Sequence, residues 1–292
     1  MALPHNCRSP PLWRSAMRCE VRFMTRTLHI DTGREMQGGQ WQVRYLVERL
    51  ENATLLARFD GSFTLPKLAS LALQSDLIHV HDSRAHTLGA AIKGPPLVVS
   101  RRVAFPIGKS PASRWKYGRA DLFLAVSNFV AEKLRDAGVP GEKIRIVYDG
   151  IPIPAHRSTR EPGRVVAVPS KYRELTGIPV HLTYNLFDDL STASVFLYVS
   201  EMEGLGSAAI AAMAAGVPVV ASGAGGLPEV VEHERTGLIV RDGDYAGAVR
   251  RLLDNPALAA ELGAAGREKA IRQFSVEKMV QDTLAAYNEI LR

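Results

Sequence analysis

Cysteine is almost absent from this chain. Its two cysteines, Cys7 and Cys19, both lie within the first 23 residues, and the rest of the chain has none. The body of the chain therefore has no disulfide framework, no zinc site built from cysteines and no catalytic thiol. Long hydrophobic runs are missing as well, since no apolar stretch approaches the roughly 20 residues that a helix needs to cross a bilayer.

A strong excess of charge of one sign is also missing. The net charge is +6, and half of it comes from residues 1–23, which hold four arginines and one glutamate. Lysine and arginine nowhere cluster with interleaved aromatic residues, so no nucleic-acid partner is predicted. The mild basic excess suits an anionic small ligand or a membrane face. We expect a cytoplasmic protein, with peripheral contact at the inner face of the membrane as a further expectation.

The first 23 residues carry arginines without the apolar segment of a secretory signal. We interpret residues 1–23 as a leader that is either disordered or not translated, because Met24 stands just before the first predicted strand. A transit peptide is the alternative interpretation.

Short apolar runs alternate with helical patterns along most of the chain. Residues 27–32, 76–82 and 121–127 are typical of strands, whereas 40–50 and 128–137 have helical spacing. Because the strands are apolar runs rather than strict alternations, they indicate parallel sheets that are covered on both faces.

A proline-containing break divides this pattern into two halves. Residues 151–163 hold three prolines and read as a linker. We therefore predict an α/β fold with two doubly wound, Rossmann-like parallel-sheet domains, 24–150 and 164–292, that face a cleft.

The stretch EMEGLGS, residues 201–207, follows a predicted strand and precedes a helix. Ligands of open parallel sheets bind at the carboxyl ends of the strands. Gly204 and Gly206 would let the backbone approach a ligand, and the first amides of the helix would attract a phosphate. Glu203 would repel a phosphate but suits the hydroxyls of a sugar. The alternative is that Glu203 is an ordinary surface acid at a helix start.

The longer stretch EGLGSAAIAAMAAGVPVVASGAGGLPEVVEHERTGLIV resembles the retaining glycosyltransferases of family 4, which have the GT-B fold. The resemblance places Glu203 against the donor sugar. It places the helix-start amides that meet the diphosphate at Gly206 and Ser207, with Gly204 and Leu205 in the same substrate-binding loop.

The chain departs from this family at three points. The carboxylate that holds the ribose of the nucleotide falls on Ala211, so we expect weak donor binding, and tighter binding in Ala211→Glu. Of the arginine and lysine expected after the first strand of the carboxyl-terminal domain, only Lys171 is present, with Arg173 as a candidate replacement. The segment that follows Lys171 is short, which implies a shortened carboxyl-terminal domain.

The amino-terminal half resembles the same family more loosely. In HIDTGREMQGGQWQVRYL, the resemblance sets Gly38 and Gly39 against the phosphates, although an ordinary loop is the alternative. In DLIHVHDSRAHTLGA, His81 matches the histidine that reaches the sugar, with a packing role as the alternative. We expect His79 to point to the opposite side of its strand and to be structural.

Other polar residues follow predicted strands. Arg101 and Arg102 follow PLVVS, so one of them is expected to meet an acceptor or a phosphate, with a solvated pair as the alternative. Ser127 is expected to cap the helix that follows it. We read Asp188 and Asp189 as a helix start capped by Asp189 rather than as a metal site.

These features predict a retaining, nucleotide-sugar-dependent glycosyltransferase of the hexosyltransferase type. Glu203 and His81 would act in catalysis, and the acceptor would be a glycan, a lipid or a cell-envelope precursor. No metal or other cofactor is expected. The rival prediction is a catalytically degenerate GT-B scaffold that binds a sugar nucleotide or a protein partner.

Overall fold

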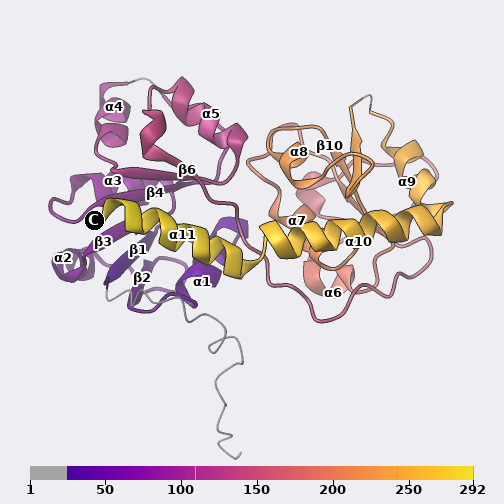
Figure 1. Cartoon of the computed structure of the whole chain (residues 1–292), viewed down its shortest axis with the longest axis horizontal. Coiled ribbons are helices and arrows are strands. Elements are labelled where there is room, and N and C mark those ends of the chain that lie inside the picture. The colour runs from indigo at the N-terminus through magenta and orange to yellow at the C-terminus, as the bar shows by residue number, and fades with distance from the viewer. Residues whose placement is uncertain (1–24, 109, 242, 292) are drawn as a thin grey trace, which may run out of the picture.

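The chain folds into two α/β domains, each built on a parallel sheet (Figure 1). The computed structural model describes residues 25–108, 110–241 and 243–291. The predicted leader and Met24 lie outside the described residues. Two doubly wound parallel-sheet domains were predicted, and this architecture confirms them.

The sheet of the N-terminal domain has the strand order β2-β1-β3-β4-β5-β6, and all neighbouring strands are parallel. Several strands are buried along their whole length, as apolar runs in a covered parallel sheet should be. The strands are β1 (Thr27–Asp31), β2 (Ala53–Ala57), β3 (Leu77–Val80), β4 (Leu97–Arg101), β5 (Leu122–Ala125) and β6 (Ile144–Ile146). The helices are α1 (Gly38–Val47), α2 (Leu65–Gln74), α3 (Ser83–Ala91), α4 (Pro111–Gly118), α5 (Asn128–Asp136) and the 3-10 turn η2 (Gly141–Lys143).

The sheet of the C-terminal domain has the order β11-β10-β9-β7-β8 and is parallel throughout. Its strands are β7 (Val165–Ala167), β8 (Val180–Leu182), β9 (Val195–Tyr198), β10 (Val219–Ser222) and β11 (Gly237–Val240). The helices that follow or connect them are the 3-10 turn η3 (Pro169–Lys171), α6 (Leu186–Leu190), α7 (Ser207–Ala214), α8 (Leu227–Val230), α9 (Tyr245–Leu253) and α10 (Pro256–Gln273).

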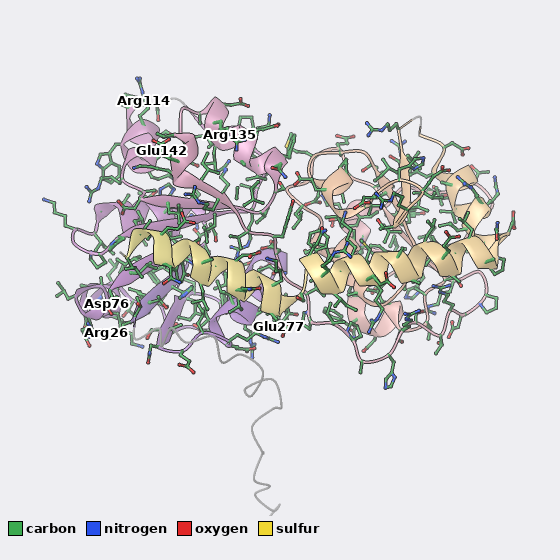
Figure 2. All side chains as sticks on the ribbon, in the orientation of Figure 1. Arg26, Asp76, Arg114, Arg135, Glu142 and Glu277 are labelled. Carbon is green, nitrogen blue, oxygen red and sulfur yellow. The ribbon has the colours of Figure 1, made fainter. Side chains whose placement is uncertain are left out.

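The last helix, α11 (Val276–Ile290), returns to the N-terminal domain and crosses the face of its sheet (Figure 1). Its buried residues Met279, Val280 and Tyr287 pack in one cluster with side chains from β3, β4 and β5. Glu277, labelled in Figure 2 where this helix begins, pairs with Arg49 at 3.5 Å. The predicted division assigned all of 164–292 to one domain, whereas 276–290 pack on the other.

The two segments that cross between the domains lie side by side. Ile151 forms a parallel bridge with Ser275, and its amide donates to the carbonyl of Phe274 at 2.8 Å. The later part of the predicted linker is held on the C-terminal domain, because the amides of Ser158 and Thr159 donate to carbonyls there. Among the described residues, no helix combines the length and the apolar character that crossing a membrane requires.

Candidate active site at the domain boundary

Two helix starts, one from each domain, face each other at the boundary. Gly206 precedes α7 with φ of +104°, a left-handed conformation that favours glycine, and no side chain caps this helix. No side chain caps α1 either. A Cβ atom at Gly38 would lie 3.5 Å from Oγ of Ser207, while Gly39 borders open space. The unpaired amides at such helix starts attract anions, so this place suits a phosphate group.

Glu203 lies just before α7 and is held by two side chains from its own domain. One carboxylate oxygen accepts a hydrogen bond from the Tyr198 hydroxyl at 2.8 Å and pairs with Nζ of Lys171 at 3.2 Å. The Lys171 ammonium also donates to Oγ of Ser200 at 2.9 Å. Burial and the nearby carboxylate raise the pKa of Tyr198 well above its ordinary value, so this hydroxyl keeps its proton. The structure thus brings the predicted residues Glu203 and Lys171 together.

Gly204 lies in close contact with the N-terminal domain. Its carbonyl accepts a hydrogen bond from Oγ of Ser127 at 2.6 Å. A Cβ atom here would overlap the backbone oxygen of Arg102. Oγ of Ser127 also accepts from the amide of Val130 at 3.1 Å, which confirms the predicted helix cap. Glycine is therefore required at 204 for the domains to meet in this way.

Glu229 forms a second link across the boundary. Its carboxylate accepts hydrogen bonds from the amides of Asn128 at 2.9 Å and Phe129 at 3.0 Å, at the start of α5. The Tyr148 hydroxyl donates to it at 3.1 Å. Burial, with the help of this carboxylate, raises the pKa of Tyr148 to about 12. A negative charge at a helix start is a favourable arrangement, so Glu229 stabilises the contact.

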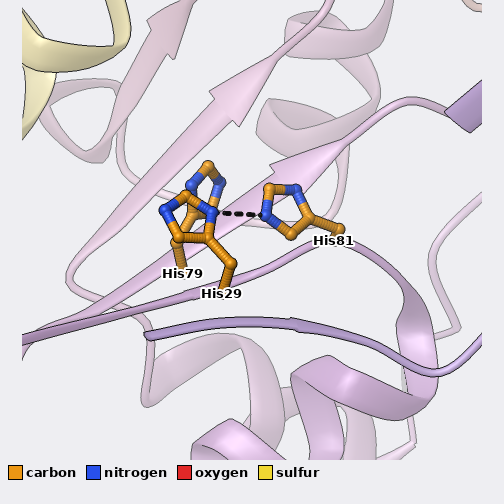
Figure 3. Close-up of side chains that lie close together, drawn as sticks. All are labelled: His29, His79 and His81. Carbon is orange, nitrogen blue, oxygen red and sulfur yellow. Dashed lines mark hydrogen bonds between the residues drawn. The ribbon is translucent and has the colours of Figure 1, made fainter. Parts of the chain in front are cut away.

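Three histidines lie together at the carboxyl ends of β1 and β3 (Figure 3). His29 and His79 are paired in register on these two strands, and Nε2 of His81 lies 3.0 Å from Nδ1 of His29. The rings of His79 and His81 are 4.1 Å apart. The prediction that His79 points to the opposite side was wrong, because residues two positions apart on a strand share a face.

His79 has a structural environment, as predicted. Its ring nitrogens lie 2.6 Å from the Tyr287 hydroxyl and 2.8 Å from Oγ of Ser100, so it joins the sheet to α11. Burial lowers the pKa of His29 to about 3 and lowers the pKa values of His79 and His81 well below the ordinary value. All three rings are therefore neutral near pH 7.

The three rings are also a candidate set of metal ligands, since their nitrogens lie within 4.8 Å of one another. Both nitrogens of His79 are already engaged by hydroxyl groups, and the Arg102 guanidinium lies against His81. A divalent cation would have to displace these bonds and stand beside a fixed positive charge. The group fits a hydrogen-bonded network better than a metal centre. That the protein needs no metal or cofactor stays a prediction.

The two arginines after β4 have different surroundings. Arg102 pairs with Asp149 at 2.9 Å, and its Nη1 lies 3.2 Å from Nδ1 of His81. Burial raises the pKa of Asp149, and Arg102 opposes that shift. Arg101 turns away to the Tyr117 hydroxyl at 2.8 Å and the Phe105 carbonyl at 2.5 Å. Of the two, Arg102 is the one placed at the domain boundary.

Some predicted positions lie elsewhere. Ala211 is 1% exposed and Leu205 is 2% exposed, and both belong to the apolar core. Arg173 lies over the ring of Tyr245, at 5.9 Å.

The acidic pair is a helix start, as predicted, because α6 begins at Leu186. Its predicted cap was wrong. Asp189 pairs instead with Arg164 at 2.6 Å and His181 at 3.1 Å.

Four residues of the site were not identified from the sequence: His29, Tyr198, Asp149 and Glu229. His29 and Tyr198 lie within strands, whereas ligand-binding residues are expected after the strands. Asp149 lies three residues after the end of β6, and Glu229 ends the short motif GGLPE, so both carried a usable signal.

Both halves of the chain match known protein families. Residues 15–153 match the model described as Glycosyltransferase Family 4, and residues 165–269 match the model described as Glycosyl transferases group 1. The first of these matches begins within the predicted leader.

Curated relatives align with part of the chain. Alpha-maltose-1-phosphate synthase of Mycolicibacterium smegmatis is 39% identical over 117 residues, which are 37% of this chain and 30% of that protein. A GDP-mannose-dependent alpha-(1-6)-phosphatidylinositol monomannoside mannosyltransferase of Mycobacterium tuberculosis is 47% identical over 89 residues, which are 30% of this chain and 22% of that protein. The chain thus spans less than a third of the length of either relative.

Solved structures match over almost the whole chain. Anabaena HepE in complex with UDP-glucose aligns with a TM-score of 0.72 at 17% identity, over 91% of this chain and 100% of that one. A glycosyltransferase from Rickettsia africae aligns with a TM-score of 0.73 at 14% identity, over 91% and 99% of the two chains. At these identities the likeness establishes the fold.

Proposed function

We propose that this chain, which belongs to the family 4 and group 1 glycosyltransferases of GT-B fold, transfers a sugar from a nucleotide-sugar donor to an acceptor with retention of anomeric configuration. The observation that carries the proposal is the pair of uncapped helix starts that face each other where Gly38 meets Ser207. Helix-start amides of both domains lie at this place and would attract a diphosphate, which supports the proposal.

The residues around this place have separate roles in the proposed reaction. The bond from the anomeric carbon to the diphosphate breaks, and a bond to the acceptor oxygen forms on the same face of the sugar. The helix-start amides and Lys171 stabilise the charge that develops on the leaving diphosphate. Glu203 holds the sugar hydroxyls, and the leaving phosphate takes the acceptor's proton. No protein nucleophile is needed.

The acceptor is proposed to bind on the N-terminal side, next to Gly204. The loop after Arg102 exposes Val103 by 46% and Phe105 by 64%, and the nearby helix α4 exposes Trp115 by 49% and carries Lys116. Apolar and cationic side chains together suit a lipid-linked glycan at an anionic membrane surface. The native chain should cosediment with phosphatidylserine vesicles, and Phe105→Ser should abolish this cosedimentation. Equal cosedimentation of the native chain and the variant would contradict this acceptor class.

A thermal-shift panel of UDP-, GDP-, ADP- and TDP-sugars tests the donor. A true donor at about 100 times its dissociation constant adds about 2.7 kcal/mol of stability, which raises the melting temperature by several degrees. Glu203→Gln should melt like the native chain but lower transfer by ~10²-fold or more. If no sugar nucleotide raises the melting temperature, the non-catalytic scaffold replaces this proposal. The anomeric proton coupling of the product reports retention.

A further inference from the structure

A chain of hydrogen bonds runs from Asp149 through Arg102 and His81 to His29, across the carboxyl ends of the N-terminal sheet. Arginine donates hydrogen bonds and never accepts them. Nδ1 of His81 therefore accepts from Arg102, and the single proton of the neutral His81 ring sits on Nε2.

The same argument gives the position of the proton on the His29 ring. The Nε2 hydrogen of His81 is donated to Nδ1 of His29, so the proton of His29 sits on its own Nε2. That Nε2 is buried and has no hydrogen-bond partner among the described residues. Each of these hydrogen bonds thus has a defined donor and acceptor. Arg102, which pairs with Asp149, donates to His81, and His81 donates to His29.

Both nitrogens of His81 are occupied in this arrangement, and the residue is only 7% exposed. It can bond a sugar hydroxyl only by breaking a bond to Arg102 or His29. Arg102 differs, because its bonds to Asp149 and His81 use two of the five N–H groups that a guanidinium carries. Its own backbone oxygen lies against Gly204, so the side chain starts beside the proposed donor site.

We propose that Arg102 is the cationic residue by which the N-terminal domain binds the diphosphate of the donor, and that Asp149, His81 and His29 are positioning residues that hold its guanidinium. The proposal rests on the proposed function. It places one cation on each side of the boundary, Arg102 opposite Lys171, where the expected second cation beside Lys171 is missing. A guanidinium held by two neighbours is pre-organised to donate to phosphate oxygens.

Inorganic pyrophosphate is the first probe, because it carries the diphosphate without sugar or base. In calorimetry at low salt, Arg102→Gln should bind pyrophosphate at least ~10-fold more weakly than the native chain. Arg101→Gln, which changes the neighbouring arginine that faces Tyr117, is the matched control and should bind as the native chain does. Equal binding by Arg102→Gln and the native chain would overturn the proposal.

Two substitutions at one position separate positioning from direct contact. An asparagine carboxamide reaches the place of Nδ1 in histidine, whereas a glutamine carboxamide reaches the place of Nε2. His81→Asn can still accept from Arg102, so it should keep transfer within ~10-fold of native. His81→Gln should lose ~10²-fold, mainly through weaker binding of pyrophosphate and donor. If His81 touches the sugar through Nε2, the order reverses and the proposal fails. His86→Asn, at a buried histidine outside the chain of bonds, controls for packing.

Nitrogen-15 spectra of the histidine rings in the full chain test the hydrogen-bond order without any ligand or activity. His81 and His29 should both be neutral and protonated at Nε2. Protonation of His81 at Nδ1 would overturn the positioning role even if a variant fails to fold. The outcomes also separate the two proposals. A donor that binds Arg102→Gln normally refutes only this inference. Pyrophosphate binding that Arg102→Gln weakens, with no donor found in the thermal panel, refutes the proposed function but not the anion-binding role of Arg102.

Discussion

The two domains support the candidate site with different kinds of buried residues. Behind the N-terminal side lie buried polar groups joined by hydrogen bonds, among them His29, His79, His81 and the Arg102–Asp149 pair. Behind the C-terminal side lies α7, whose residues 209–214 are alanines, an isoleucine and a methionine, all buried. Glu203 and Lys171, the charged groups of that side, lie at the boundary itself.

This difference separates two ways of building a binding site. A helix of small residues lets a ligand approach its first amides closely. The helical backbone itself fixes the direction of these amides, so no side-chain hydrogen bonds are needed to orient them. A buried polar network can hold a side chain such as Arg102 in one direction, but every member must stay neutral or paired. The first design is sensitive to added volume and charge, and the second is sensitive to pH.

Acid should therefore unfold the N-terminal domain first, and this is the largest effect that we expect. The unfolded chain takes up a proton at a histidine below about pH 6.5, whereas folded His29 does so only near pH 3. The stability that neutral His29 contributes to the folded state is fully present above pH 6.5 and is lost as the pH falls towards 3. At pH 5, protonation of His29 in the unfolded chain alone lowers the free energy of unfolding by about 2 kcal/mol. His79, His81 and His86 act in the same direction.

Hydrogen exchange followed by mass spectrometry between pH 7 and pH 4.5, corrected for the intrinsic rates, measures this difference. Strands β1 to β6 should lose protection first. Helix α11 should lose protection with them and not with α10, its neighbour in sequence, because Tyr287 bonds His79. Simultaneous loss in both domains, or earlier loss in β7 to β11, would show that the histidine network does not limit acid stability.

Added charge should break the C-terminal side. Ala211→Glu places a carboxylate where the side chain is 1% exposed and surrounded by apolar residues. We expect a loss of at least ~3 kcal/mol in the free energy of unfolding, from desolvation and overpacking together. This replaces the expectation from the sequence that Ala211→Glu tightens donor binding. Chemical denaturation measures the loss.

Ala208→Glu is the matched control, because Ala208 lies on the same helix and is only half-buried. It should change the free energy of unfolding by less than ~1 kcal/mol. Should Ala211→Glu instead stay as stable as the native chain and bind UDP-glucose ~10-fold more tightly, position 211 does reach the ligand and its burial here is not decisive.

The fold followed from the sequence wherever burial leaves a local pattern. Residues 27–32 and 121–127 were predicted as strands and became β1 and β5, because strands covered on both faces are apolar runs. The placement of α11 could not be predicted in this way. An amphipathic helix shows that it has an apolar face, but not which of two sheets that face covers.

The site was predictable only where one segment contributes both the element and the side chain. The glycines and Glu203 before α7 are of this kind. His29 and Asp149 meet His81 and Arg102 through the strand order β2-β1-β3-β4-β5-β6, a non-local property that no single segment encodes. The side predicted for His79 was wrong although the sequence suffices to place it, because the period of a strand is two residues and His79 and His81 therefore share a face.

The smallest effect should come from the contact that joins the two sides. Glu229→Gln keeps an oxygen that can accept from α5 but removes the negative charge at its first turn. Losing charge–dipole stabilisation and charge assistance should lower the free energy of unfolding by about 1 kcal/mol. Denaturant unfolding measures this loss, with Glu48→Gln, in an exposed pair with Arg44, as a control expected to change it by less than ~0.5 kcal/mol. The exchange of the Asn128 and Phe129 amides should rise in Glu229→Gln and stay unchanged in Glu48→Gln. Unchanged exchange in both variants would show that the contact does not hold the domains together in solution.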